Sequence, residues 1–474
     1  MSAFGEEIPG PSGRFLVGNT WDYERDRDGF LEACRRRYGD VFRFGQHTIV
    51  VSDPELIQQV LAETNSTYIL AAKPDQDRDT AVHDTASWMQ GRHRIGRGLG
   101  QALLAAHAQR LDQALQECFG ALAAREFSVL ETAQEISCRA SAEFCLHEGA
   151  QAAAELTAAF NRLALVDMAG AQRWTRRLPT VFTPRRRRLA TVERACLDLL
   201  GAQLQNRAAQ QPAQEPRDLL DVMVDPRNGP PLDVKHGARM LKTILAAARG
   251  IPGTALAWII RELGSNAELR AEVRAEADAL EDAVATGLVH RLPFTHAAVQ
   301  EILRVHPPVW LLGRVAAEPT QLAQWAVRPG ERVLFSPHQL HHDPRWWREP
   351  EQLDPRRWLE NERPYSHRCA YLPFGGGPRV CLGTRLGLLQ LTLSAARLAR
   401  DYDIELIAPD RRAPVHAVLR APAGLHARLT PRAAATADPS TTTGTAAQDV
   451  PRSGRSGRGP GEEPAEGVAH GSPT

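Results

Sequence analysis

The chain has 474 residues, of which 43% are hydrophobic and 24% are charged, with 57 Lys and Arg against 56 Asp and Glu. An apolar fraction of this size can fill a sizeable core, which excludes a disordered or fibrous protein. A formal charge of +1 argues against a nucleic-acid binder, because such domains usually carry a clear basic excess.

Neither the N-terminus nor the cysteines indicate export from the cell. Residues 1–23 contain no apolar run long enough for a signal peptide or a membrane span. The seven cysteines are scattered and form no CxxC pair and no zinc spacing, so neither a disulfide framework nor a structural metal site is indicated. We therefore expect a soluble, cytoplasmic protein without a membrane anchor.

The first part of the chain predicts a β-hairpin followed by a helix. Two strand-like runs, 41–44 and 49–51, flank Gly45-Gln46-His47, and Asp53-Pro54 opens a helix that ends near Leu61.

Most of the remaining chain predicts helices. Residues 85–310 carry apolar side chains at three- and four-residue spacing, most regularly over 101–125 and 187–207. Residues 309–430 mix short strands and turns with one further helix near 384–400. The expected fold class is mainly α with a small β region (α+β).

The composition changes near residue 431. The stretch 431–474 is rich in Ser, Thr, Gly, Pro and Ala and has almost no large apolar side chain. Such a segment cannot bury enough surface to offset its ordering entropy. We expect one large domain over 1–430 and a disordered tail over 431–474.

One cysteine follows a cluster of glycines and precedes a predicted helix, in the segment 374–383 (FGGGPRVCLG). Glycines allow main-chain N–H groups to turn toward a sulfur, and the positive end of a helix favours thiolate over thiol. A thiolate is the form that binds a soft or redox metal. Taken alone, the same pattern also fits a buried structural cysteine in a glycine-rich turn.

The whole string resembles the signature of the cytochrome P-450 superfamily, Phe-x-x-Gly-x-Arg-x-Cys-x-Gly. Its fixed positions are met by Phe374, Gly377, Arg379, Cys381 and Gly383. The resemblance implies haem b with Cys381 as the axial metal ligand, Arg379 on a haem propionate, and Phe374 near the sulfur. An anionic sulfur ligand pushes electron density onto the iron and favours O–O cleavage.

Two further segments match the family. Glu301 and Arg304 lie three residues apart before two prolines, and Arg357 lies in the later segment 353–358 (LDPRRW). Helical residues at this spacing can pair. By resemblance, Glu301, Arg304 and Arg357 form a cluster that holds the haem-binding core together.

The resemblance also predicts basic contacts to the haem propionates. Arg314 follows the two prolines in an extended segment. His93 and Arg97 fit a helix on which the family places a His or Trp and an Arg four residues later. Trp88 and Arg92 fit the same spacing, so two registers are open.

The predicted central helix, 243–258, departs from the family. Most members carry Ala/Gly-Gly-x-Asp/Glu-Thr here, and the acid and alcohol help deliver protons to dioxygen. Aligning on Trp258 puts Gly250 at the acid position and Ile251 at the alcohol, whereas aligning on Thr254 puts Gly253 at the acid position.

The acid is missing in both alignments. Pro252 should kink or open the helix. Thr254 and Arg249 are the catalytic candidates, the first as the alcohol and the second as the cation that holds a substrate carboxylate. A propionate contact or a helix-surface position is the alternative for Arg249.

The resemblance implies a haem-thiolate monooxygenase that hydroxylates an apolar small molecule, and we expect it to act in bacterial natural-product biosynthesis. It would use O2 and electrons from a ferredoxin or flavodoxin with a separate reductase, act as a monomer, and bind no nucleic acid. The departing helix leaves two alternatives open: a peroxide-dependent or rearrangement-type enzyme, and a non-catalytic haem-binding protein. Residues 62–90 and 160–190 are expected to cap the substrate pocket.

Overall fold

The protein is described here by a computed structural model. It describes residues 7–13, 18–70, 88–96, 100–147, 149–159, 184–229, 233–279, 291–360, 363–407, 415–416, 418–422 and 424–432.

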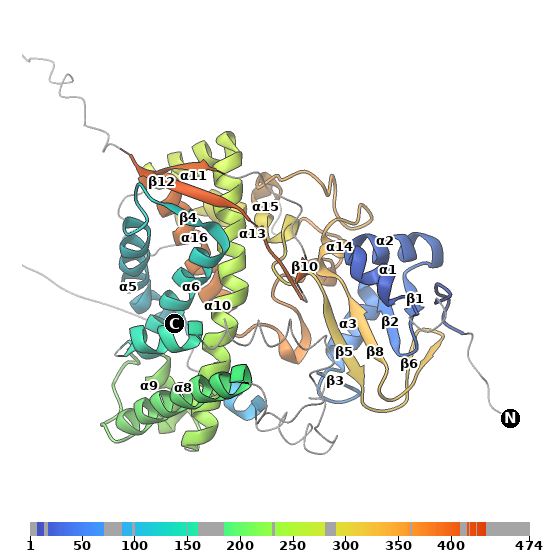
Figure 1. The fold of residues 1–474 in the computed structure, drawn as a ribbon, viewed down its shortest axis with the longest axis horizontal. Helices are drawn as coiled ribbons and strands as arrows, with labels where there is room; N and C mark the ends of the chain where they lie inside the picture. The colour runs from blue at the N-terminus through green and yellow to red at the C-terminus, as the bar shows by residue number, and fades with distance from the viewer. Residues whose placement is uncertain are drawn as a thin grey trace, which may run out of the picture. The chain divides into compact units, whose positions relative to one another are not determined.

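Helices make up most of the described fold (Figure 1). In chain order they are α1 (Thr20–Arg25), α2 (Arg27–Tyr38), α3 (Pro54–Ala62), α5 (Gln101–Gly120), α6 (Val129–Leu146), α8 (Pro184–Ala208), α9 (Leu219–Val224), α10 (Val234–Ser265), α11 (Ala267–Ala279), α13 (Pro293–Val305), α14 (Pro337–His341), α15 (Arg356–Glu360) and α16 (Thr384–Asp401). Residues 88–96 and 150–159 are also helical, and short 3-10 turns cover Pro226–Asn228, Arg368–Ala370 and Gly377–Arg379.

The strands form small sheets. The largest has the order β1-β2-β8-β5-β3, built from β1 (Val41–Phe44), β2 (Thr48–Val51), β3 (Tyr68–Ile69), β5 (Leu312–Ala316) and β8 (Arg332–Phe335). A three-stranded sheet pairs β12 (His426–Pro431) with β4 (Glu126–Ser128) and β9 (Tyr402–Leu406). Two hairpins complete the set, β6 (Thr320–Leu322) with β7 (Trp325–Val327) and β10 (Val415–His416) with β11 (Leu419–Arg420).

The predicted hairpin and the helix after it are confirmed. β1 and β2 pair antiparallel with Phe44 opposite Thr48, so the turn falls on the predicted glycine-containing segment. Asp53 caps α3 because its carboxylate accepts the N–H groups of Glu55 and Leu56, at 2.9 and 3.1 Å. Pro54 occupies the first helical position, where a missing N–H costs nothing.

The helix α10 runs through the centre of the helical part, with α6 and α16 beside it (Figure 1). Its second half, Ala255 to Leu263, belongs to the largest apolar core cluster, together with side chains of α5, α6, α13 and α16. The helix α10 continues through Pro252, so the proline does not end it, and the expected kink stays a prediction.

By length and composition alone, α10 could also cross a membrane. More than half of its most apolar window, 56%, is buried inside the fold. This burial is the pattern of a core helix, which passes the same composition test.

The predicted Glu-Arg-Arg cluster is confirmed. Glu301 accepts from Arg304 Nε at 2.9 Å and from Arg357 Nε at 3.0 Å. Glu301 and Arg304 are fully buried. Arg304 also donates to the carbonyls of His341, Pro350 and Gln352, so α13 is tied to the irregular chain that leads to α15.

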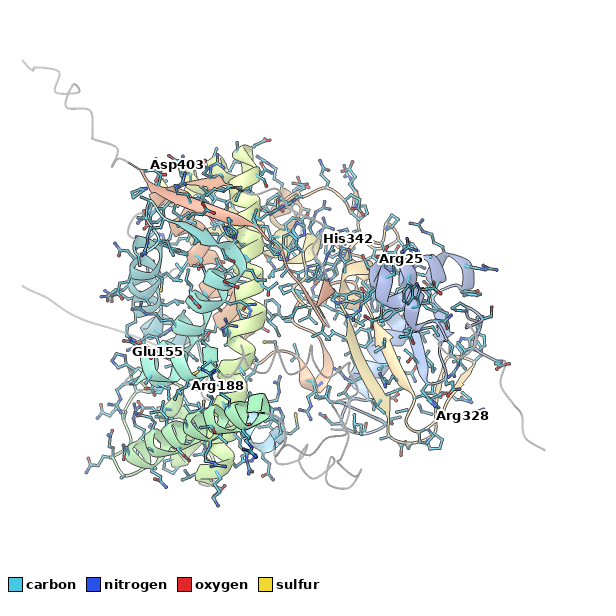
Figure 2. The ribbon with its side chains drawn as sticks, viewed as in Figure 1. Arg25, Glu155, Arg188, Arg328, His342 and Asp403 are labelled. Carbon is cyan, nitrogen blue, oxygen red and sulfur yellow. The ribbon has the colours of Figure 1, made fainter. Side chains whose placement is uncertain are left out.

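The near-zero net charge is spread over the surface in both signs. Arg25, Glu155, Arg188, Arg328 and Asp403 are all exposed and lie in different parts of the fold (Figure 2).

Candidate functional site: an apolar cavity lined by a cysteine

The glycine-rich segment folds into a tight loop that presents Cys381. The loop closes when Cys381 N–H donates to the carbonyl of Phe374, at 2.9 Å. Gly377 has φ of +67°, and a Cβ there would collide with the carbonyl oxygen of Leu61 at the end of α3. The signature therefore needs glycine at this position for both backbone conformation and space. Thr384 then starts α16 and donates its hydroxyl to the carbonyl of Cys381, at 2.8 Å.

Cys381 lines a cavity of about 290 Å³. The surrounding walls are mostly apolar, and most of their residues come from the cysteine loop with α16, from α10, and from helix 88–96 with α6. The cysteine loop and α16 contribute Phe374, Leu382, Gly383, Leu386, Gly387 and Gln390, α10 contributes Met240, Thr243, Ile244, Ala247, Ala248, Ile251, Pro252 and Ala255, and helix 88–96 with α6 contributes Trp88, Arg92, Ile95, Ser141, Phe144 and Cys145. Such a cavity suits an apolar ligand body.

The electrostatics of Cys381 differ from the expectation. Burial raises the pKa of its thiol, whereas the N–H of Gly383, the hydroxyl of Thr384 and the charge of Arg92 lower it. The side chain is exposed toward the cavity and still surrounded by protein atoms. The predicted stabilisation of thiolate by the start of a helix is therefore present but outweighed. A coordinated metal ion would deprotonate the thiol outright.

Arg92, Arg314 and Arg379 lie close enough to influence one another's charge at the cysteine loop. Burial and the charge of Arg379 lower the pKa of Arg314 to about 10, and burial and the charge of Arg92 lower the pKa of Arg379. Arg314 is 6% exposed and donates to Thr64 Oγ1 at 3.0 Å, and Arg379 donates to Asn65 Oδ1 at 2.8 Å. Thr64 and Asn65 are neutral, so the cluster fits an anionic ligand edge.

Of the two predicted pairs on helix 88–96, Trp88 with Arg92 and His93 with Arg97, the structure places the first at the cavity. Trp88 and Arg92 line it, and Arg92 donates to the carbonyl of Val380 next to the cysteine. His93 is exposed and lies on a surface hollow shared with Arg92, Gly96 and Leu382. Arg97 lies outside the described residues. The geometry thus favours the Trp88 and Arg92 register for contacts inside the cavity.

Neither catalytic candidate of α10 belongs to the described cavity lining. Thr254 is fully buried and donates its hydroxyl to the carbonyl of Gly250, at 2.8 Å. Arg249 is 4% exposed and donates to Gln134 Oε1 on α6, at 2.9 Å. A Cβ at Gly253 would lie 2.5 Å from Gln134 Cα, so α6 leaves no room for a side chain there. The catalytic roles of Arg249 and Thr254 stay predictions that this placement does not favour.

Sequence reasoning missed several polar side chains of the cavity, among them Ser141 on α6 and Gln390 on α16. Gln390 could have been predicted, because it lies one turn after Leu386 and Gly387 on α16 and therefore shares their face of the helix. Ser141 carried no such signal, since the packing of α6 against α10 decides which face meets the cavity. The expected capping segments fall largely on residues 71–87 and 160–183, which lie outside the described residues.

The fold and the cysteine-lined cavity define a haem-thiolate protein, and comparison with known families agrees. The family model described as Cytochrome P450 matches residues 8–423, so the chain belongs to the cytochrome P450 family. The solved structure of retinoic acid-bound cyanobacterial CYP120A1 superposes with a TM-score of 0.72 and 20% identity, covering 90% of this chain and 100% of that one.

Two curated relatives come from Streptomyces melanosporofaciens. Cyclooctatin synthase is 37% identical over 161 residues, which is 33% of this chain and 35% of that protein. Cyclooctat-9-en-7-ol 5-monooxygenase is 31% identical over 190 residues, which is 39% of this chain and 41% of that protein. The chain thus spans about two fifths of the length of the curated relatives it matches.

The cofactor of this family is a haem with a cysteine thiolate as axial ligand, and the residues present fit it. The cavity offers apolar walls for a macrocycle and a sulfur on one wall. Arg92 also lines it, and the charges of Arg92 and Arg379 act in turn on Arg379 and Arg314, so the three arginines form a basic group next to the cavity for carboxylate edges. Cys381 would hold the iron, and Arg92, Arg314 and Arg379 would pair with the propionates.

Proposed function

We propose that this protein is a haem-thiolate monooxygenase that oxidises an apolar small molecule. The observation that carries the proposal is the position of Cys381 on the wall of an apolar cavity that α10 also lines. When bound, the haem supplies oxygen activation, with the thiolate favouring O–O cleavage. The family model and a relative named as a monooxygenase support this class of reaction.

The residues of this chain would bind and orient the reactants. Apolar side chains of α10, Ala247, Ala248, Ile251 and Ala255, exclude bulk water from the space in front of the sulfur. Among the α10 residues that line the cavity, Thr243 has the only hydroxyl, and it donates to the carbonyl of Arg239, at 2.8 Å. Ordered water or a substrate hydroxyl would therefore carry protons in place of the usual acid and alcohol.

The proposed electron donor is a ferredoxin-type protein with a separate reductase. Arg92 and His93 line a surface hollow with Leu382, which is next to the cysteine. A basic surface at this place would attract an acidic partner and speed its docking.

The substrate class follows from the lining and from the names of the relatives. The cavity is mostly apolar, and one relative is named for oxidation at carbon 5 of cyclooctat-9-en-7-ol. We extend this to a polycyclic or similarly apolar natural product made in a bacterial cytoplasm.

The peroxide-dependent alternative rests on Arg249 as a carboxylate anchor. The hydrogen bond from Arg249 to Gln134 and its place behind the cavity lining weigh against that role. A non-catalytic haem protein is the remaining alternative.

The deciding experiment is turnover of a panel of apolar polycyclic compounds by the haem-loaded protein. We expect product with O2, NAD(P)H, ferredoxin and reductase, and little with peroxide alone. Product only with peroxide would favour the peroxide-dependent enzyme. Tight binding of the compounds without turnover under either condition would favour the non-catalytic protein.

A further inference from the structure

The proline in α10 leaves one backbone carbonyl without its usual partner. In an α-helix, the N–H of residue 252 would donate to the carbonyl of Ala248, four residues earlier. Pro252 has no N–H, so it cannot make this bond, and yet α10 continues through it. Ala248 and Pro252 both line the cavity, so the break falls in the wall of the proposed active site.

A side chain from the neighbouring helix replaces the missing donor. Ser137 on α6 donates its hydroxyl to the carbonyl of Ala248, at 2.8 Å. Ser137 accepts in turn from Gln390 Nε2 on α16, at 3.1 Å. Ser137 is fully buried and Gln390 is 2% exposed, so water does not readily take over either bond. The chain of bonds joins α16, α6 and α10 at the level of the cavity.

The same stretch of α10 has a second contact with α6. The backbone of Gln134, one turn before Ser137, packs on Gly253 so closely that a Cβ at Gly253 would lie 2.5 Å from Gln134 Cα. The side chain of Gln134 accepts from Arg249 Nη1, at 2.9 Å. Contacts at 248, 249 and 253 therefore surround Pro252 on the α6 side.

We propose that Ser137 and Gln390 are positioning residues that hold the Ala248–Pro252 wall of α10 at a fixed place relative to the cysteine loop. Gln390 belongs to α16, which starts three residues after Cys381, so the bonds connect the two opposite structural supports of the cavity. The proline by which α10 departs from the family pattern is thus matched by contacts from α6. A proline in the wall requires a donor from α6, and the close approach of α6 requires glycine at 253.

A double-mutant cycle between Ser137 and Pro252 tests the compensation directly. Ser137→Ala leaves the Ala248 carbonyl buried without a donor, and should lower the melting temperature by roughly 2–4 °C. Pro252→Ala restores an N–H at 252 that can donate to this carbonyl. In the Pro252→Ala background, Ser137→Ala should therefore cost at most about half as much. An equal loss in both backgrounds would overturn the proposal.

Ser394→Ala is the matched control for this cycle. Ser394 is a buried serine of α16 whose hydroxyl makes no hydrogen bond within the described structure. Its removal should change the melting temperature by less than about 1 °C in either background. A loss as large as that of Ser137→Ala would show that removing any buried hydroxyl has this effect, and would contradict the proposal.

The positioning role must be tested by a measurement that does not change when the protein is merely less stable. The stretching band of carbon monoxide bound to the ferrous, haem-loaded protein responds to the wall that faces the ligand. We expect Ser137→Ala and Gln390→Leu to shift or broaden this band at a temperature where both variants are folded, and Ser394→Ala to leave it unchanged. A band unchanged by Ser137→Ala would overturn the positioning role. The melting cycle does not depend on the proposed function, so failure of one can be told apart from failure of the other.

Discussion

At the scale of single residues, Arg314 shows how the arginine group next to the cavity is prepared for an anion. Its guanidinium is almost fully buried, with its pKa lowered to about 10 by burial and by the charge of Arg379. Without an anion, this arrangement costs stability, because the folded chain holds the cation less favourably than the unfolded chain does. A haem propionate next to Arg314 would supply the counter-charge and make the buried cation favourable.

Arg314→Met should therefore separate haem binding from stability. We expect haem to be retained about 10- to 100-fold less tightly, since one charge-assisted hydrogen bond is lost. The haem-free protein should melt no lower than the parent, because a buried like-charge contact is relieved. Haem transfer to an acceptor protein and thermal melting measure the two effects. Arg25→Met, at an exposed arginine of α1, is the control and should change neither. Unaltered haem retention in Arg314→Met would contradict the assignment.

His341 gives a prediction about pH. Its imidazole is fully buried, Nδ1 contacts the carbonyl of Arg304 at 3.0 Å, and Nε2 accepts from Leu372 N–H at 2.9 Å. Both contacts suit a neutral ring with its proton on Nδ1, because a second proton on Nε2 would face the Leu372 N–H. Burial is the main cause that lowers the pKa of His341 to about 3.

Because the pKa of His341 is lowered in the folded chain, the folded protein loses stability as the pH falls. The unfolded chain binds a proton at His341 near pH 6.5 and the folded chain only near pH 3, so this contribution to stability is complete above pH 6.5 and is lost as the pH falls to about 3. The loss is at most about 5 kcal/mol. His341→Gln should be less stable at pH 7 and lose less stability than the parent between pH 6.5 and 4. His47→Gln, at an exposed turn, should keep the parent's slope. An unchanged slope in His341→Gln would refute the argument.

Sequence and structure agree where a motif fixes both residue type and spacing. Cys381 could be predicted because the signature fixes its neighbours, and the positive φ and close approach of Gly377 show why that position needs glycine. The choice between Arg92 and Arg97 could not be predicted, because Trp88-to-Arg92 and His93-to-Arg97 have the same helical spacing. In the structure, Trp88 and Arg92 line the cavity.

At the scale of elements, the Glu301 cluster shows how short segments are fixed without regular structure. The carboxylate of Glu301 accepts from Arg304, Arg357, Trp358 Nε1 and the N–H of Asp354, all within 3.0 Å. One buried anion thus joins α13 to α15.

Glu301→Gln should destabilise the protein strongly, because Arg304 would stay buried without its counter-charge. We expect a loss of about 3–5 kcal/mol in unfolding free energy, measured by chemical denaturation of the haem-free protein. Glu24→Gln is a suitable control, because Glu24 forms a surface pair with Arg27 and should cost less than about 1 kcal/mol. A loss of similar size at both positions would contradict this account of the cluster.

The central helix marks the limit of prediction from sequence at this scale. The sequence shows that no acid stands at 250 or 253. It does not show that the packing of α6 leaves no room for a side chain at 253. The sequence predicts Thr254 and Arg249 as active-site residues because their chemistry suits the reaction. Their faces are set by the packing of α6 on Gly253, a contact between residues more than a hundred positions apart in the chain. No local pattern encodes it.

At the scale of the whole molecule, the strands at the end of the described fold close its core. β12 pairs with both β4 and β9, and its Ala427 and Leu429 are fully buried. The backbone N–H of Arg432 still donates to the carbonyl of Asp401, at 2.9 Å.

A chain that stops after Arg432 should therefore keep the melting temperature within about 2 °C and bind haem as the full chain does. A chain that stops after Leu425 loses β12 and should fail to melt cooperatively, because two strands lose their partner. Circular dichroism melting compares the two. Cooperative melting of the shorter chain, or loss of haem binding after the first truncation, would contradict the proposed boundary near residue 430.

The central claim is that Cys381 binds haem iron as a thiolate in the apolar cavity. The most direct measurement is the absorption spectrum of the reduced protein with carbon monoxide, compared with that of Cys381→His. We predict a strongly red-shifted Soret band for the parent protein and its complete loss in the variant, with haem still bound. The same red-shifted band in Cys381→His, or its absence from the parent, would contradict the account.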